Sequence, residues 1–236
     1  LVLLALANAA RGIDAVESNP DMLQIMATHP AAPAGRAYSR PEVRTVSADA
    51  RHFLARRARH WDLIHVPPVG AASPDRGLAE DFLMTAEGLA TAVSRLDRQG
   101  WLSVAVDLEL PPRAAFKLVS TLRRALAPDT GSELADRVLA IRSMTTITVL
   151  VKQAPIAPAD IATLQAFAKA RGFDVVYYPG MERGEANRRI RLDEPIFHDG
   201  FRSLLGEGAA DFVARYKFDI AAATDDRPFF HDTFRW

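Results

Sequence analysis

Two acidic residues follow runs of amino acids that are typical of β-strands. Glu17 closes the run Ile13–Glu17, and Asp49 comes two residues after the run Val43–Ser47. In open α/β sheets, ligands bind outside the carboxyl ends of the strands, so these are positions where chemistry is expected. A carboxylate at the first position can accept two hydrogen bonds from ribose hydroxyls. At the second, Asp49 can accept from an adenine amino group while the backbone N–H of Ala50 donates to the ring.

Both acids also have a purely structural interpretation. The positive end of a helix dipole favours a carboxylate, and Glu17 precedes a helix that Asn19 and Pro20 are expected to begin. Aspartate is likewise a preferred N-cap residue, and a helix is expected directly after Asp49. The sequence leaves the capping and the ligand-binding interpretations open.

Three further residues are weaker catalytic candidates. His65 is the titratable residue at the end of the predicted strand Trp61–Val66, and a histidine there is either catalytic or a core or capping residue. Asp75 and Glu80 lie beyond that strand and either face a cationic substrate or are solvated carboxylates of a helix N-terminus. The segment 224–228 (TDDRP) is typical of a turn closed by side-chain to backbone bonds, or else supplies an acidic and a basic group that close a ligand pocket.

The elements that would position these residues alternate in type. We expect strands at 13–17, 43–47, 61–66 and 101–106, and helices at 1–11, 19–29, 49–59, 77–96 and 113–126. Strands that alternate with helices of this length predict βαβ crossovers and a mostly parallel sheet with helices on both faces. The first strand and the glycine-rich turn that usually follows it in nucleotide-binding α/β domains are not found in the chain.

After residue 136 the alternation stops. The runs 137–142 and 146–152 are separated by three residues, which leaves room for an antiparallel hairpin and none for a crossover helix. We further expect a helix at 158–171, a strand at 173–178 and helices near 194–205 and 209–216. The predicted domains are therefore an α/β domain over 1–153, ending in the hairpin, and a C-terminal α/β extension over 154–236 that packs on it.

Composition excludes several classes of protein. The 236 residues include no cysteine, which removes thiol catalysis and cysteine-ligated metals, and 29 basic residues balance 29 acidic ones. A formal net charge of zero argues against a general nucleic-acid-binding protein. No HExxH, P-loop or GxSxG motif occurs, and no metal is expected. The apolar run 1–7 is far shorter than the ~20 residues of a membrane span, so a soluble domain is expected.

Several of these segments together resemble a known family. They are 13–20 (IDAVESNP), 47–53 (SADARHF), 61–66 (WDLIHV), 78–87 (LAEDFLMTAE), 111–113 (PPR) and 224–228 (TDDRP). They resemble the spermidine synthase-like domains of the class I S-adenosylmethionine-dependent transferase superfamily that are fused to membrane segments in large bacterial proteins. The resemblance covers nearly the whole chain. It implies a Rossmann-like fold, and a cytoplasmic domain tethered to the inner membrane through its parent protein.

The resemblance also implies a ligand and a reaction. Glu17 would hold the ribose of S-adenosylmethionine or its decarboxylated form, Asp49 and Ala50 would hold the adenine, and a polyamine is a possible acceptor. The chain departs from the family where an aspartate would help to deprotonate the attacking amine, because residues 66–68 are Val-Pro-Pro. The resemblance implies aminopropyl or methyl transfer, and the departure favours the alternative, a non-catalytic ligand-sensing or structural domain of a membrane protein. A nicotinamide oxidoreductase shares the ribose-binding acid but not the hairpin ending.

Overall fold

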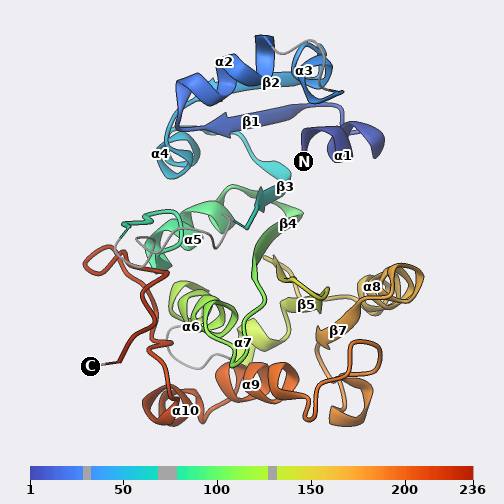
Figure 1. Ribbon diagram of the computed structural model, residues 1–236, viewed down its shortest axis with the longest axis vertical. Coiled ribbons are helices and arrows are strands. Elements are labelled where there is room, and N and C mark those ends of the chain that lie inside the picture. The colour runs from blue at the N-terminus through green and yellow to red at the C-terminus, as the bar shows by residue number, and fades with distance from the viewer. Residues whose placement is uncertain (29–32, 69–78, 127–131, 236) are drawn as a thin grey trace. The chain divides into compact units, whose positions relative to one another are not determined.

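The computed structural model describes residues 1–28, 33–68, 79–126 and 132–235. The chain divides into two compact units, residues 1–58 and residues 59–236, which we call unit 1 and unit 2. Each is described by itself, and both can be followed in Figure 1.

Unit 1 contains a two-stranded parallel sheet and four helices. In chain order these are α1 (Val2–Ala7), β1 (Ile13–Glu17), α2 (Pro20–Thr28), α3 (Pro33–Tyr38), β2 (Val43–Ser47) and α4 (Ala50–Ala55). β1 and β2 pair in register from Ile13 opposite Val43 to Glu17 opposite Ser47. The helices α2 and α3 form the crossover that a parallel pair requires, because consecutive parallel strands cannot be joined by a tight turn.

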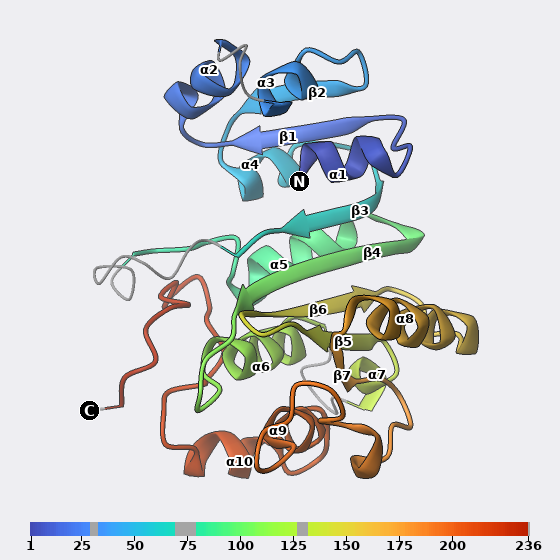
Figure 2. The ribbon, with the colours of Figure 1, turned by 45° about the vertical axis from the view of Figure 1, so that its right-hand side comes forward.

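Unit 2 is built on a five-stranded mixed sheet. Its elements are β3 (Trp61–Val66), α5 (Ala86–Ser94), β4 (Leu96–Asp107), α6 (Ala114–Leu126), α7 (Ser132–Ala135), β5 (Val138–Arg142), β6 (Thr146–Lys152), α8 (Pro158–Arg171), β7 (Asp174–Tyr177), a 3₁₀ turn (Arg183–Glu185), α9 (Ile196–Leu205) and α10 (Ala209–Arg215). The strand order is β3-β4-β6-β5-β7, as Figure 2 shows. β3 and β4 are parallel, whereas β6 is antiparallel to both of its neighbours and β7 is antiparallel to β5.

The predicted hairpin is therefore present, and its return strand β6 lies between β4 and β5. Because β6 is antiparallel to both, β4 and β5 run in the same direction, as in a parallel sheet into which one reversed strand has been inserted. Helices α5 and α6 pack against β4 and against each other. Helix α8 packs on β7, and its Leu164 and Ala168 share a core cluster with Leu139 and Ile141 of β5. The predicted fold class, a Rossmann-like α/β fold with helices on both faces and an antiparallel hairpin, is confirmed.

The helical layer under this sheet is organised around one aromatic ring. Phe116 of α6 makes edge contacts with the rings of Phe197, Phe201, Phe212 and Tyr216, which belong to α9, α10 and the residue after it. Edge-to-face geometry is the favoured arrangement for aromatic pairs. The cluster joins residues beyond 154 to a helix that precedes the hairpin.

Several expected boundaries differ from the structure. Helix α1 ends at Ala7 rather than at residue 11, and α5 begins at Ala86 rather than at residue 77, because the hydroxyl of Thr85 caps it by accepting from the N–H of Gly88 at 3.0 Å. Strand β4 begins at residue 96 rather than 101, and helices α3 and α7 were not expected. Residues 154–236 belong to the same compact unit as residues 59–153, and β7 pairs with β5. The division of the chain at residue 153 stays a prediction.

Candidate functional site

Glu17 and Asp49 lie at the same edge of the sheet in unit 1. Glu17 is the last residue of β1 and stands opposite Ser47, the last residue of β2. The pairing continues one residue further, since the N–H of Ala48 donates to the carbonyl oxygen of Glu17 at 3.1 Å. Parallel strands have their carboxyl ends on the same side of a sheet. The structure therefore brings Glu17 and Asp49, the residues predicted to bind the ribose and the adenine, to adjacent positions.

Each of these carboxylates uses one oxygen in a backbone hydrogen bond next to a helix N-terminus. The Oε1 atom of Glu17 accepts from the backbone N–H of Asn19 at 2.9 Å and lies 3.4 Å from the Ser18 hydroxyl. The Oδ1 atom of Asp49 accepts from the N–H of His52 at 2.8 Å, which makes Asp49 the N-cap of α4. The structure therefore shows the capping interpretation for Asp49, whereas α2 is capped by Asn19, whose Oδ1 accepts from the N–H of Asp21 at 2.9 Å, and Glu17 holds the N–H of that capping residue.

The second oxygen of each carboxylate is not used in this way. Within the described part of the chain, Oε2 of Glu17 and Oδ2 of Asp49 have no hydrogen-bond partner. An ionised carboxylate has about four acceptor positions, so one backbone bond leaves most of its capacity unused. Ala50 is the first residue of α4, where a helix leaves its backbone N–H groups without an intrahelical partner. Capping and ligand binding are therefore compatible at this edge.

In unit 2, the weaker candidate His65 is paired with a residue that the sequence did not indicate. Its Nδ1 atom lies 2.9 Å from the hydroxyl oxygen of Ser103, which stands opposite it on β4. Burial lowers the pKa of His65 below its ordinary value, which favours the neutral form of the ring. The strand register that joins the two residues could not be obtained from the sequence.

The two remaining weak candidates are not brought together. Glu80 is exposed and lies ahead of α5, and Asp75 falls outside the described residues. Sequence reasoning also passed over two acids at the carboxyl end of β4. Asp107 ends that strand, and Glu109 pairs with Arg113 at 2.8 Å and accepts from the N–H of Ala114 at 2.9 Å, where it caps α6.

The segment 224–228 forms the turn that its composition predicts. Thr224 and Arg227 exchange two backbone hydrogen bonds, and the Oδ1 atom of Asp225 accepts from the hydroxyl of Thr85 at 2.8 Å. The N–H of Asp225 donates to Glu87 at 3.0 Å. The turn thereby fastens the C-terminal segment to the N-terminus of α5, and Figure 2 shows this segment at the end toward which β3 and β4 point.

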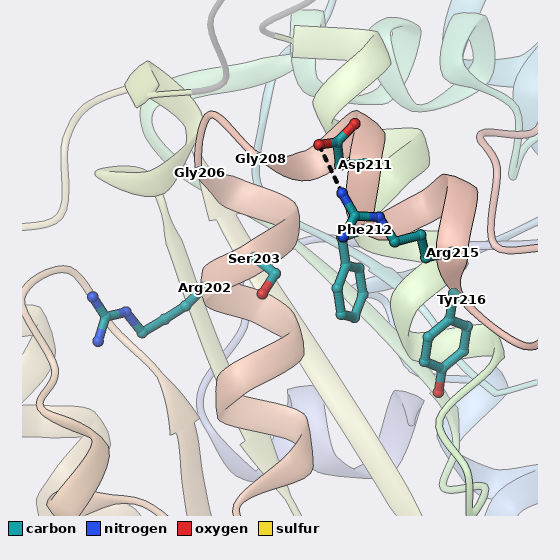
Figure 3. Close-up of a pocket in the computed structure, with 8 residues that line it drawn as sticks. All are labelled: Arg202, Ser203, Gly206, Gly208, Asp211, Phe212, Arg215 and Tyr216. Carbon is teal, nitrogen blue, oxygen red and sulfur yellow. Dashed lines mark hydrogen bonds and ion pairs between the residues drawn. The ribbon is translucent and has the colours of Figure 1, made fainter.

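An open pocket of about 390 Å³ lies between α9 and α10 in unit 2 (Figure 3). Its lining includes the rings of Phe212 and Tyr216 and an exposed ion pair of 3.1 Å between Asp211 and Arg215. The side chain of Arg202 points away from these rings. None of the residues predicted to act on a ligand contributes to this pocket.

The described residues contain no group of three or more His, Asp or Glu side chains that could hold a metal ion. Likewise, no helix in the part of the chain that the structure describes combines the length and hydropathy that a membrane crossing requires.

Comparison with known proteins adds likeness at the level of the fold. The chain has a Rossmann-like α/β fold with one inserted antiparallel strand. Solved structures similar to it include a probable spermidine synthase from Corynebacterium glutamicum, 13% identical, with a TM-score of 0.48 over 70% of this chain and 56% of that one. Another is human methyltransferase-like protein 13 in complex with SAH, 17% identical, with a TM-score of 0.47 over 71% of this chain and 74% of that one.

These likenesses concern the path of the chain and not its activity. The chain spans little more than half the length of the spermidine synthase. No family model matches the sequence, and no curated protein matches it. The antiparallel pairing of β5 with β6 is the ending that distinguishes this fold from the all-parallel dinucleotide fold of nicotinamide oxidoreductases.

Proposed function

We propose that the chain is a transferase-like domain that binds an adenosyl nucleoside of the S-adenosylmethionine type at the carboxyl ends of β1 and β2. The observation that supports the proposal most directly is the placement of Glu17 and Asp49 at the carboxyl ends of adjacent parallel strands, each with one carboxylate oxygen available. In this assignment Glu17 accepts from the ribose hydroxyls. Asp49 accepts from the adenine amino group and the N–H of Ala50 donates to the ring.

The fold agrees with this location. Helices α2 and α4 begin shortly after β1 and β2, so their backbone N–H donors and the two acids lie at the same edge of the sheet. A ligand with both hydroxyl donors and ring acceptors finds complementary groups there. When bound, a sulfonium nucleoside supplies an electrophilic carbon, and the transferred group is a methyl or an aminopropyl group according to whether S-adenosylmethionine or its decarboxylated form binds.

The acceptor substrate of such a transfer is less defined by the chain. A protonated amine must lose a proton before it attacks, and residues 66–68 at the end of β3 offer no carboxylate to receive it. We propose that the acceptor is a small molecule such as a polyamine. We also propose that the domain is cytoplasmic and tethered to the inner membrane through its parent protein.

Isothermal titration calorimetry with S-adenosylmethionine, its decarboxylated form, SAH and methylthioadenosine tests the nucleoside site. Glu17→Gln and Asp49→Asn keep an acceptor for the capping N–H but remove the charge. Each lost charge-assisted bond of about 1.5–3 kcal/mol predicts a loss of affinity of roughly 10- to 150-fold. Glu42→Gln is the matched control, because Glu42 precedes β2 at the opposite edge and pairs with Arg40.

Two results would contradict the proposal. One is that none of the four nucleosides binds to the wild-type chain. The other is that Glu17→Gln and Asp49→Asn bind as tightly as Glu42→Gln does, because the strand-end carboxylates would then have no part in binding.

A second candidate function is a non-catalytic domain that senses a ligand or serves as a structural part of a membrane protein. The Val-Pro-Pro sequence at residues 66–68 favours it, since a transferase acting on amines needs a group there that accepts a proton. Mass spectrometry of reactions with S-adenosylmethionine or its decarboxylated form and a panel of polyamines separates the two. Nucleoside binding without any methylated or aminopropylated product supports the sensing function, and turnover refutes it.

A further inference from the structure

The contact between His65 and Ser103, at the carboxyl end of β3, determines which ring nitrogen of His65 carries the proton. The two residues stand opposite each other on the parallel strands β3 and β4, one residue before the pair Val66 and Val104. The Nδ1 atom of His65 lies 2.9 Å from the Ser103 hydroxyl oxygen. The position of Nδ1 is thereby fixed by the sheet, because the strand register fixes both residues.

The surroundings of Ser103 decide which partner donates. Ser103 is 6% exposed, and its hydroxyl has no other hydrogen-bond partner among the described residues. If Nδ1–H donated, the hydroxyl hydrogen would be buried without an acceptor, which costs about 1–3 kcal/mol. If the hydroxyl donates to Nδ1, only an oxygen lone pair is left unused. The second arrangement is favoured, and it places the ring proton of neutral His65 on Nε2.

The Nε2 atom is available to a ligand. It has no hydrogen bond to the described residues, and it is not one of the fully buried unpartnered polar atoms, which here include Nε2 of His198. His198 shows the contrast: its ring is 1% exposed, with Nδ1 3.1 Å from the carbonyl oxygen of Val176. His65 is only half-buried, and β3 ends one residue after it, at Val66.

We propose that His65, held by Ser103 as the Nε2–H tautomer, is a hydrogen-bond donor that binds an acceptor atom of a small carboxylate or carbonyl ligand at the carboxyl end of β3. A neutral imidazole with its proton on Nε2 cannot remove a proton with that nitrogen, so His65 is not the base for an amine nucleophile. It also offers no lone pair there to an ammonium group. Assigning this ligand as the acceptor substrate rests on the proposed transferase function, whereas the tautomer does not.

Long-range proton–nitrogen correlation spectra of the ¹⁵N-labelled chain test the tautomer without any ligand. His65→Gln identifies the signal of His65 among the six histidines. We expect the wild-type chain and Ser103→Thr, which keeps the hydroxyl, to show the Nε2–H pattern. Ser103→Ala removes the hydroxyl that holds Nδ1 as an acceptor and should add a minor share of the Nδ1–H form, because a free neutral imidazole is a mixture in which Nε2–H prevails. A wild-type Nδ1–H pattern, or a wild-type mixture of the two forms like that of Ser103→Ala, overturns the proposal, and the wild-type Nδ1–H pattern would decide even where a variant does not fold.

Titration with adipate and with putrescine tests the ligand class, because the two share a four-carbon chain and differ in their carboxylate or ammonium ends. We expect adipate to shift the His65 signal and putrescine not to. His65→Phe should lose about tenfold in adipate affinity, and His65→Gln, whose amide N–H reaches a similar position, should lose less. A shift with putrescine alone, or with neither compound, overturns the binding step. Failure of the nucleoside calorimetry with these results intact would refute the proposed function alone.

Discussion

Replacing Asp174 with alanine should be the most destabilising single change in unit 2 among those that spare its apolar core. The carboxylate accepts four hydrogen bonds, from the N–H groups of Arg188, Arg189 and Ile190 at 3.0, 2.8 and 2.7 Å and from the guanidinium of Arg142 at 3.0 Å. The Arg142 and Asp174 side chains are 3% and 2% exposed. The alanine variant leaves the Arg142 charge buried beside unpaired backbone donors, and losing one partner of a buried ion pair costs about 3–5 kcal/mol.

Urea unfolding followed by tryptophan fluorescence measures this loss, because Trp61 and Trp101 both belong to unit 2. Asp211→Ala is the matched control. It removes a carboxylate from an ion pair of similar length, 3.1 Å to Arg215, whose side chains are 78% and 81% exposed, so the expected cost is below about 1 kcal/mol. Asp174→Asn should fall between the two, since an amide oxygen still accepts from the loop. An alanine variant within about 1 kcal/mol of the wild type would refute the reasoning on buried charge.

Three other changes test separate contacts. Thr85→Val removes both the cap of α5 and the bond to Asp225. It should lower the free energy of unfolding by about 1 kcal/mol and speed proteolysis of the C-terminal segment. Thr85→Ser keeps both bonds and is the control. Gly200→Ala places a Cβ within the ring of Phe116 and should lower the free energy of unfolding by about 1–3 kcal/mol, whereas the Cβ of Gly208→Ala meets no atom within 4 Å. Equal effects of the two substitutions would exclude the steric cause. Burial raises the pKa of Tyr177 to about 12. The stability that its neutral phenol supplies is therefore complete below pH 10 and is lost as the pH rises toward 12. The urea midpoint of Tyr177→Phe should decline less than that of the wild type over this pH interval, and an equal decline would refute the role of Tyr177.

Strands whose limits are marked by local residues were predicted to the residue. β1, β2, β3 and β6 have the expected bounds, because each is a run rich in β-branched or aromatic residues between turn-forming or polar neighbours. Helix α8 was predicted equally well. Pro158 begins it, and Gly172 ends it in the left-handed conformation with φ of 71°.

Features that depend on distant residues could not be predicted. The residues before Ala86 have a helical pattern, but the chain forms turns there because Asp81 and Ala86 donate to backbone carbonyls of Pro228 and Ala223. These partners are more than a hundred residues away in the sequence. The pairing of His65 with Ser103 depends in the same way on the β3 and β4 register, which no local pattern specifies.

The acids at the ends of β1 and β2 show a different limit, because there the residues were identified correctly and only their role stayed open. A capping carboxylate and a ribose- or adenine-binding carboxylate occur at the same place in an α/β sheet, since both complement donors gathered at a helix N-terminus. The sequence therefore cannot separate them. The structure shows that the two roles use different atoms: backbone N–H groups at the helix N-termini bind Oε1 of Glu17 and Oδ1 of Asp49, and the other oxygens stay available. A substitution that keeps the cap but removes the charge can for this reason measure ligand binding without disturbing the fold, which alanine at either position would not do.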